Sequence, residues 1–500
     1  DLASSLEDMQ IQRGAGTSTN GAGAFGASIN LRTAGIPSKA YAEVSGSYGS
    51  FNTHKETVRA GSGLLGNHWA FDARISNIQS DGYRDRATSD LKSYFLQGGY
   101  YGENTTLKLI AFGGKEKTYH AWDGISREQL ETDRTYNPNG AIKDDNLNKG
   151  NIIGFYDDQT DNYEQTNYQL IFNHLFSPEW HLNIALHYTD GFGYYQEYKN
   201  GRTLEEYGLK PFYLPENTEA QTKTNLVRQK LVDSGFGGGV FSVDYKDEKL
   251  SASLGGGLNH YSNDHYGKVI WVKNYTEPLN PDHEYYRNNG SKTDGNIYAK
   301  ANYQITKGLH AYADLQYRYI SYKIEGDNDK WDWTADPGHL QRLNVNEDFS
   351  FFNPKAGLFW QFNPNHSAYA SFAVAQKEPT RNNYTDGLFD ELPRPEKMLD
   401  YELGYTFRNS RFTAGVNLYY MDYTDQLVLN GKVNDIGEAM AENVKDSYRM
   451  GIELSLGARI TDWLRWDLNG TWSKNRIKNY TGYMSAVSYT HLRAHETLSD

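Results

Sequence analysis

Apolar and polar residues alternate along the chain in segments of roughly ten residues, a length typical of membrane β-strands, and no long hydrophobic block interrupts them. At the end of the series, Leu464, Trp466, Leu468 and Trp472 alternate with charged and polar residues. Successive side chains of a strand point to opposite faces of a sheet, so such a segment predicts one apolar and one polar face. A long series of these segments, with Tyr and Trp near their ends, predicts a transmembrane antiparallel β-barrel with a polar lumen.

Seventeen segments follow this pattern. They are residues 40–48, 54–61, 68–77, 91–101, 105–112, 163–176, 180–188, 236–245, 250–261, 296–305, 309–324, 352–362, 368–375, 400–407, 412–424, 448–456 and 463–474.

The connections between the segments alternate between short and long, which is typical of outer-membrane barrels. Short turns are expected at 63–67, 102–104, 177–179, 246–249, 306–308, 363–365 and 409–411. Long polar loops are expected at 113–162, 190–235, 262–295, 325–351, 376–399 and 425–447. Loops beyond about fifteen residues are usually functional or disordered, so six of them on one rim predict a surface that captures a ligand.

The composition fits a barrel better than a set of soluble domains. Only 38% of the residues are hydrophobic, yet 14% are aromatic, including 40 Tyr and 10 Trp, and the mean hydropathy is −0.76. A disordered chain would lack the aromatics, and a soluble protein of this size would need denser apolar cores. A barrel with a polar lumen needs neither.

Charge and cysteine content narrow the function classes further. The net charge of −13, with basic residues scattered along the chain, argues against a nucleic-acid partner. The absence of cysteine removes disulfides and thiolate metal sites. The chain contains no run of eighteen apolar residues, so the sequence predicts no membrane-spanning helix. The chain opens at Asp1 without a signal peptide, so we expect that it is truncated, since an outer-membrane protein must be exported.

Motifs that carry enzyme chemistry find no support. Gly21–Gly26 matches the dinucleotide pattern G-x-G-x-x-G, but a strand-like segment follows it where a helix is required. His260, Asp264 and His265 lack further ligands to complete a metal site. No nucleophile motif has a supporting context. We therefore predict no enzyme, no cofactor and no bound metal.

Aromatic residues in the long loops are candidates for ligand contact. Tyr and Trp offer large, stiff surfaces with a polar group, which suits an amphipathic ligand, although an aromatic girdle at the membrane interface would use the same residues. The candidate substrate-binding residues are Tyr119, His120, Trp122, Tyr194, Tyr195, Tyr261, Tyr266, Trp331 and Trp333.

The first thirty residues resemble a known family. Ile11-Gln12-Arg13-Gly14, the small-residue stretch 16–26 and Ile29-Asn30-Leu31 resemble the end of the plug domain of TonB-dependent outer-membrane receptors. Residues 40–59 resemble the first barrel hairpin of this family, and 401–405 and 451–454 resemble two of its late strands. The chain looks most like the Bacteroidetes-type receptors for ferric-siderophore-like ligands.

The resemblance implies a 22-stranded barrel, filled by an N-terminal plug, in the outer membrane of a Gram-negative bacterium. The TonB-ExbB-ExbD complex of the inner membrane would supply energy through a short N-terminal box that this chain lacks, as it lacks about five final strands. We expect residues 1–33 to be the C-terminal remnant of the plug and 34–486 an incomplete barrel, embedded in outer-membrane lipid. Residues 487–500 lack alternation and resemble an adapter-derived, non-native tail.

The family also implies one contact between plug and barrel. Its plug arginine, at the position of Arg13, meets two lumenal glutamates that match Glu402 and Glu453. The alternation independently places both glutamates inward, because Tyr401, Leu403, Ile452 and Leu454 take the lipid side. We therefore expect a charge-assisted latch that breaks when the plug moves. Three merely hydrated lumenal residues are the alternative.

Three functions follow from the sequence. The first is energy-coupled uptake of a scarce small molecule or metal chelate, for which a ferric-siderophore-type iron chelate is the leading ligand. The second is a passive porin-like barrel, or one that imports an oligosaccharide or cobalamin. The third is a secreted β-rich enzyme, which would need a dry core and a catalytic set. The plug-like segment at residues 11–31 favours the first.

Overall fold

The structure, a computed structural model, describes residues 3–20, 23–33, 35, 38–144, 149–215, 217–280, 283–332, 335–386, 392–433 and 439–480. Its main sheet contains seventeen strands. They are β3 (Ala40–Tyr48), β4 (His54–Ser62), β5 (Trp69–Ser80), β6 (Ser89–Tyr101), β7 (Thr105–Tyr119), β10 (Thr160–Leu175), β11 (Trp180–Thr203), β12 (Lys223–Lys246), β13 (Leu250–Val272), β14 (Glu284–Thr306), β15 (Leu309–Asp332), β16 (His339–Asn363), β17 (His366–Lys377), β18 (Glu396–Arg408), β19 (Phe412–Val433), β20 (Ala439–Arg459) and β21 (Arg465–Ile477).

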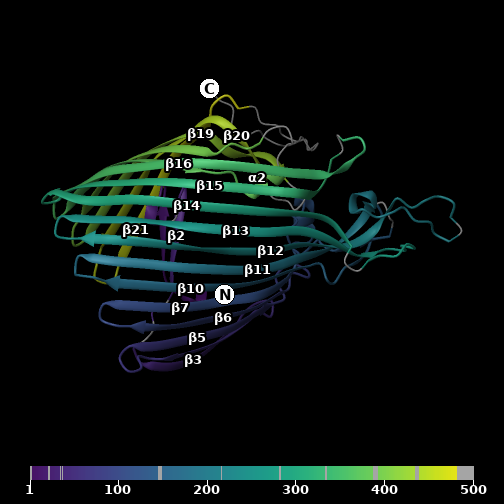
Figure 1. Ribbon diagram of the computed structural model, residues 1–500, viewed down its shortest axis with the longest axis horizontal. Helices are drawn as coiled ribbons and strands as arrows, with labels where there is room; N and C mark the ends of the chain where they lie inside the picture. The colour runs from purple at the N-terminus through teal and green to yellow at the C-terminus, as the bar shows by residue number, and fades with distance from the viewer. Residues whose placement is uncertain are drawn as a thin grey trace.

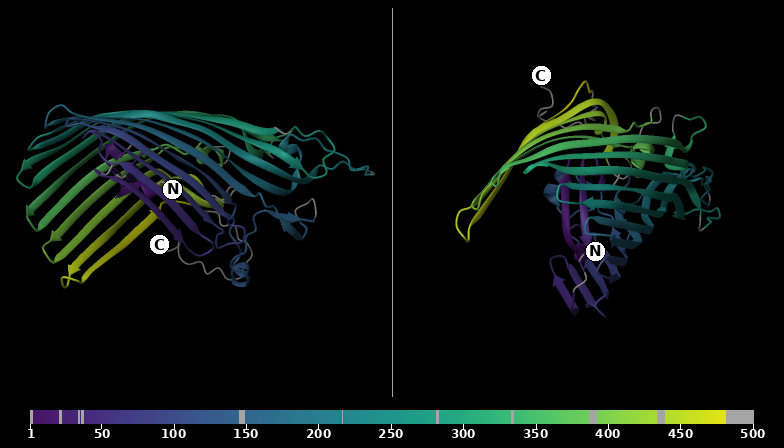
Figure 2. Two further views of the ribbon diagram at one scale, coloured as in Figure 1. Left: turned by 90° about the horizontal axis from the view of Figure 1, so that it is seen from below. Right: turned by 60° about the vertical axis from the view of Figure 1, so that its left-hand side comes forward.

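The strands form an antiparallel barrel wall in which each strand pairs with the next one in the sheet. Continuous registers run from β3 to β7, from β7 to β10, and on to β21. In the part of the chain that the structure describes, no residue-by-residue register joins β21 to β3, and both strands are exposed along almost their whole length. Figure 2 shows the curvature of this wall, with the first and last strands at its two ends.

The structure confirms the predicted strands, and it places the predicted short turns together at one end of the wall. The turn at 102–104 closes with a hydrogen bond from Gly102 N to Thr105 O of 2.8 Å. At the turn between β12 and β13, the Asp247 carboxylate accepts from the backbone N–H groups of Lys249 and Leu250 at 2.8 and 2.7 Å. Asp and Asn side chains favour tight turns because they bond to their own backbone in this way.

The predicted long loops were wrong over much of their length. Strand β13 continues eleven residues past its predicted end at Tyr261, to Val272, and β11 continues from Tyr188 to Thr203. The reason is physical: alternation with an apolar face is needed only inside the membrane, whereas hydrogen bonding between strands can continue beyond it. Figure 1 shows these extensions on the right, where they project from the wall.

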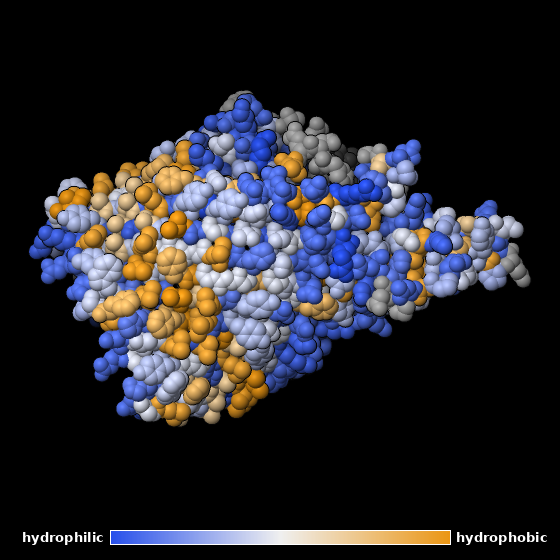
Figure 3. All heavy atoms as spheres, viewed as in Figure 1, coloured by the Kyte–Doolittle hydropathy of each residue, from blue (hydrophilic) through white to orange (hydrophobic). Residues whose placement is uncertain are grey.

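The outward face of the wall is apolar, as the alternation predicts. On β15, Leu315 and Tyr317 are 50% and 48% exposed, whereas Asp314 and Arg318 point inward and are buried. In Figure 3, apolar residues gather over the half of the wall toward the short turns, and hydrophilic residues dominate the projecting end. Among the described residues, no helix is long and apolar enough to cross a membrane.

The N-terminal segment, residues 3–33, lies against the inner face of this wall (Figure 2). It contains the short 3-10 helices η1 (Ala3–Ser5) and η2 (Ser18–Asn20) and the strands β1 (Leu6–Arg13) and β2 (Ala27–Thr33). The two strands pair with each other in an antiparallel hairpin that is separate from the wall. The strand that follows Gly26, where the dinucleotide pattern requires a helix, argues against a nucleotide site.

The long-loop end carries the remaining elements. These are α1 (Arg127–Thr132), the hairpin of β8 (Ala141–Lys143) and β9 (Ile152–Phe155), η3 (Glu205–Tyr207) and α2 (Arg381–Thr385). Helix α2 follows β17 and packs on an inward-facing apolar cluster through Tyr384, whose ring meets that of Tyr322 at 5.7 Å. This packing folds the loop between β17 and β18 into the barrel.

The lipid-facing assignment of β15 is testable at Leu315. A charged side chain on the lipid face near the membrane midplane costs about 2–4 kcal/mol. We expect Leu315→Arg to lower the free energy of unfolding in lipid vesicles by about this amount, and Leu315→Met to leave it almost unchanged. Urea titration measures both variants. Equal stability of the two would contradict an outward-facing Leu315.

Candidate functional site

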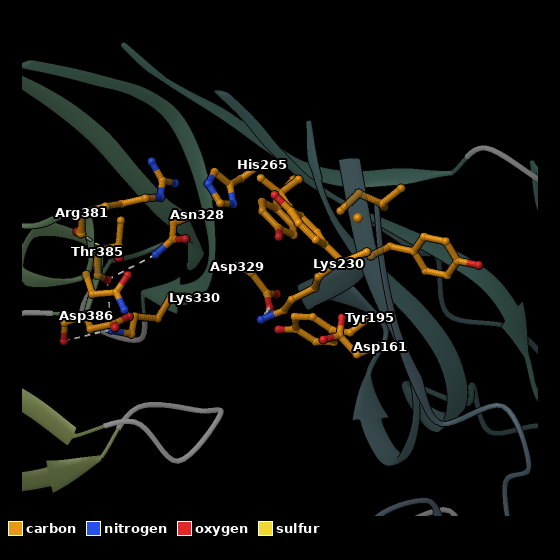
Figure 4. A pocket seen from close by; sticks show the side chains of 17 residues that line it. Asp161, Tyr195, Lys230, His265, Asn328, Asp329, Lys330, Arg381, Thr385 and Asp386 are labelled. Atoms are coloured by element: carbon orange, nitrogen blue, oxygen red, sulfur yellow. Dashed lines mark hydrogen bonds and ion pairs between the residues drawn. The ribbon is translucent and has the colours of Figure 1, made fainter. Parts of the chain in front are cut away.

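Two cavities lie side by side at the long-loop end of the lumen. The first has a volume of about 300 Å³ and lies between the strands β10–β13 and the loop that carries α2. The second, of about 390 Å³, is lined from β11, β12, η3, β15 and β16. Both are lined by Asp329 and Lys330 near the end of β15. Figure 4 shows Arg381, Asn328 and Thr385 on one side of the first cavity and Lys230 and Tyr195 on the other.

Basic residues gather around these cavities. The two cavities are lined by six cations from four separate segments: Lys199, Arg202, Arg228, Lys230, Lys330 and Arg381. The basic residues are scattered along the sequence, but the prediction that they form no cluster was wrong, because the fold brings these six together. Neighbouring strands bring together residues that are as much as 182 positions apart in sequence, and no local pattern signals this.

Arg228 is the centre of an ion cluster beside the two cavities. Its guanidinium lies 3.0 Å from Glu197 and 3.1 Å from Asp329, and only 6% of its side chain is exposed. Lys230 also pairs with Asp329. Burial opposes ionisation of Glu197, but Arg228 and Lys199 outweigh it and lower the pKa of Glu197 to about 2. Both carboxylates therefore stay charged, and the cluster fixes the ends of β11, β12 and β15.

A second ion cluster anchors the loop that carries α2. Arg318 of β15 lies 2.5 Å from Asp294 and 2.8 Å from Glu378, and Lys292 also pairs with Glu378. Glu378 directly follows β17 and precedes α2. Because the Arg318 and Glu378 side chains are at most 9% exposed, this contact holds the start of the loop inside the lumen.

Three predicted aromatic residues form one cluster beside the first cavity. The His120 ring is fully buried and stacks on Trp122 with ring centroids 3.9 Å apart. Trp122 meets Tyr195 edge-on at 5.5 Å, and Tyr195 lines the cavity together with Tyr194. Trp122 is 44% exposed, so this cluster offers an open aromatic surface.

The other predicted aromatic residues lie elsewhere. Trp331 lines the second cavity. Tyr119 is buried and donates to the carbonyl oxygen of Tyr156 at 2.8 Å, which holds a loop in place. Tyr261 and Tyr266 lie on β13, not in a loop, and Tyr266 stacks under Arg287 at 4.1 Å. Trp333 lies outside the described residues.

The histidines that were weighed as metal ligands occupy strand positions on β13. The His260 ring bonds to the Thr293 hydroxyl at 2.9 Å, and His265 bonds to Asn263 at 2.9 Å. Burial, together with Arg381 and Lys230, lowers the pKa of His265 to about 3. Among the described residues, no three His, Asp or Glu side chains are arranged to hold a metal ion.

The N-terminal segment contacts a row of charges on the wall. Lys300, Asp314 and Lys355 are direct partners in the registers of β14, β15 and β16. The fully buried Asp314 accepts from Ser18 N at 2.9 Å and from the Ser18 hydroxyl at 2.5 Å. On either side, Lys355 donates to Gly16 O and Lys300 lies 3.2 Å from the Thr19 hydroxyl. Three adjacent strands thus hold one loop of the segment.

A second contact lies at the predicted latch. Gly14 has a φ of +74°, and its N–H donates to Gly26 O at 2.9 Å. A Cβ at this position would lie 3.0 Å from Asp400 Oδ2 and 3.2 Å from Glu402 Oε1, so the backbone next to Arg13 touches the wall beside Glu402. The side chain of Arg13 lies outside the described residues.

The two latch glutamates belong to one hydrogen-bond network on the wall. The Tyr369 hydroxyl is 3.2 Å from Glu402 and donates to Asn417 at 2.9 Å. Asn417 in turn reaches Glu453 at 3.5 Å. As predicted, Leu403 and Leu454 face outward and are 53% and 51% exposed. Glu402 and Glu453 therefore take the lumenal face.

A lipid-facing antiparallel wall, a polar lumen that holds an N-terminal segment, and a charged, aromatic-lined opening together define a transport barrel of the outer membrane. Residues 106–497 match the family described as TonB dependent receptor-like, beta-barrel. The chain belongs to this family, whose members are outer-membrane receptors of Gram-negative bacteria that take small-molecule ligands and interact with TonB. The family is a class of transport receptors and not of enzymes.

Solved structures of the same fold support this assignment. The closed form of the ferric-catecholate import receptor Fiu from E. coli K12 aligns with a TM-score of 0.68 and 16% identity, over 95% of this chain and 70% of Fiu. The alcaligin receptor FauA from Bordetella pertussis aligns with a TM-score of 0.62 and 14% identity, over 96% of this chain and 69% of FauA. The copper transporter OprC aligns with a TM-score of 0.66 and 14% identity, over 93% of this chain and 68% of OprC. No curated protein matches the chain in sequence.

The buried His120 makes the aromatic cluster sensitive to acid. Burial lowers the pKa of His120 to about 4, from about 6.5 in an unfolded chain. The neutral ring therefore stabilises the fold fully above pH 6.5, and this contribution is lost as the pH falls through about 4.

We expect the urea concentration at the midpoint of unfolding to decrease when the pH is lowered from 7 to 4.5. The decrease should be smaller in His120→Phe, because phenylalanine keeps the stacking and cannot titrate. Circular dichroism at the two pH values measures both proteins. An identical pH dependence of the two would contradict a buried neutral His120.

Proposed function

We propose that this protein imports a scarce iron chelate across the outer membrane, with energy from the TonB-ExbB-ExbD complex. The observation that carries the proposal is the N-terminal segment lodged against the lumenal wall of a TonB-dependent receptor barrel. An open pore would have no need of a segment bound to its lumenal wall. The first structural neighbour imports ferric catecholates and the second binds alcaligin, which supports an iron chelate as the ligand.

In this proposal, residues 1–33 are the C-terminal part of a plug domain and residues 34–486 form the barrel in outer-membrane lipid. The ligand binds at the two cavities and the adjacent aromatic cluster, with Trp122, Tyr194, Tyr195 and Trp331 as contacts. Stacking on these rings positions the ligand, while the ion clusters of Arg228 and Arg318 keep the surrounding strands rigid.

Two contacts between the plug and the wall would have to open for transport. One is the proposed latch of Arg13 with Glu402 and Glu453, supported by the close approach of Gly14 to Glu402. The other is the hold of Asp314 on Ser18, in which a buried carboxylate depends on donors from the plug. Loss of these donors would leave Asp314 without most of its partners unless water enters, so movement of the loop admits water to this part of the lumen.

The iron assignment is tested by growth of a deletion strain under iron limitation. We expect the complete gene to restore growth on at least one ferric chelate, and to give no advantage with cyanocobalamin, maltooligosaccharides or copper as the limiting nutrient. Uptake that is unaffected by iron supply would overturn the iron assignment. Growth dependent on a copper source would instead favour the function of OprC.

The plug contact is tested by a reversible cross-link. These 500 residues contain no cysteine, so Ser18→Cys with Asp314→Cys introduces the only thiols among them. The Ser18 hydroxyl and Asp314 Oδ1 are 2.5 Å apart, so the two side chains point toward each other, as a disulfide between cysteines at these positions requires. We expect oxidation to stop uptake and reduction to restore it, while each single cysteine variant stays insensitive to the redox treatment. Unchanged uptake by the oxidised, cross-linked protein would contradict movement of this loop during transport.

Arg13→Ala tests the latch. The substitution removes the positive charge that would pair with the carboxylates of Glu402 and Glu453, so the plug should bind the barrel wall more weakly. We expect increased leakage of small antibiotics through the barrel and reduced uptake of the chelate, with a smaller effect of Arg13→Lys. Leakage and uptake equal to those of the wild type would remove Arg13 from the latch.

A further inference from the structure

Most buried cations around the two cavities are neutralised by carboxylates. Arg228 and Lys230 share Asp329, and Lys199 pairs with Glu197. Such pairs hold the fold and have little charge left for a ligand. A ligand that carries charge must therefore find a group outside these clusters.

Arg381 and Lys330 are different, because their hydrogen bonds go to neutral acceptors. Arg381 donates from Nη2 to the amide oxygen of Asn288, and its buried Nη1 has no hydrogen-bond partner among the described residues. Lys330 Nζ donates to the carbonyl oxygens of Thr385 and Asp386 at 3.3 and 3.2 Å. Within the described ranges, neither cation forms an ion pair with a carboxylate. No carboxylate therefore lies in direct contact with either positive charge.

The two cations also lie where a bound ligand would meet them. Both line the first cavity, and Lys330 lines the second as well. In Figure 4 they lie on the side formed by α2 and the end of β15, and the Arg381 guanidinium points across the cavity toward His265. His265 bonds to an amide and adds no negative charge.

Among the described residues, the carboxylates of the first cavity form no ion pair with Arg381 or Lys330, although the charge of Asp386 acts on Arg381 from the same side. Asp329 is already paired with two cations. Asp161 lies on the opposite side, next to Tyr195 (Figure 4). Asp386 lines the cavity beside Lys330, but it is the backbone carbonyl of Asp386, not its carboxylate, that accepts from Lys330. The side formed by Arg381 and Lys330 is thus a basic surface on a chain with a net charge of −13.

We propose that Arg381 and Lys330 select the ligand by charge, and that the imported chelate is an anion with carboxylate- or catecholate-type oxygens. This inference rests on the proposed function. An anionic oxygen at this surface forms charge-assisted hydrogen bonds with both side chains. A neutral oligosaccharide or corrinoid would cover Arg381 without giving its charge a partner, and a cationic chelate would be repelled.

The test is iron uptake by cells that carry the complete gene, with four chelates supplied one at a time. Ferric citrate and ferric 2,3-dihydroxybenzoate are anionic, ferrichrome is neutral and ferrioxamine B is cationic. We expect uptake of one or both anionic chelates only. We expect Arg381→Gln and Lys330→Gln each to raise the half-saturating concentration at least about tenfold, since a hydrogen bond to a charged group is lost.

Matched variants separate charge from packing. Arg381→Lys keeps the charge and should retain most of the affinity, whereas Arg381→Glu should lose more than Arg381→Gln. Arg394→Gln is the control, because Arg394 lies in the same loop but is exposed and paired with Asp425 at 2.9 Å. Its half-saturating concentration should match the wild type. Immunodetection at the cell surface verifies that all variants are inserted.

The outcomes distinguish failure of the charge selection from failure of the proposed iron import. Equal uptake of ferrichrome or ferrioxamine B, or an effect of Arg381→Gln no larger than that of Arg394→Gln, overturns the charge selection and leaves iron import intact. Failure to take up iron from any of the four chelates overturns the proposed function itself.

Discussion

The rest of the structure depends on one constraint: inside a membrane, every backbone N–H and C=O must be bonded within the protein. Between β3 and β21 the wall meets it by pairing each strand with its neighbours, whereas the outer edges of β3 and β21 show no such register among the described residues. The period of two then separates an apolar outer face from a polar lumenal face, so that Leu315 faces lipid and Asp314 faces inward. A buried carboxylate on such a wall needs donors, and Asp314 receives them from Ser18 of the N-terminal segment and from Tyr312 of the wall.

This constraint explains which features the sequence could predict. The strand count, the lipid face and the short turns follow from local alternation and from turn residues such as Asp247 and Asn409, and the structure confirms them. The outer extensions of β11 and β13 were missed, because strands beyond the membrane no longer need an apolar face. Tyr194, Tyr266 and Trp331 therefore lie on strands and not in flexible loops.

The candidate site was harder to predict than the fold. The aromatic residues His120, Trp122 and Tyr195 are conspicuous in the sequence, and the structure brings them into one cluster. The cations around the cavities are not conspicuous, because each of them stands alone in its own segment. Lys230 and Arg381 become neighbours of one cavity only through the strand order and the inward fold of the loop anchored by Glu378.

The central claim is that a plug segment held in the lumen makes this barrel an energy-coupled receptor and not a passive pore. The most direct measurement is the initial rate of radioactive iron uptake by cells that carry the complete gene, with and without a functional TonB protein, from the chelate that supports growth. Uptake should stop without TonB, while binding of the chelate to the cell surface persists. Uptake at an unchanged rate without TonB would contradict the central claim.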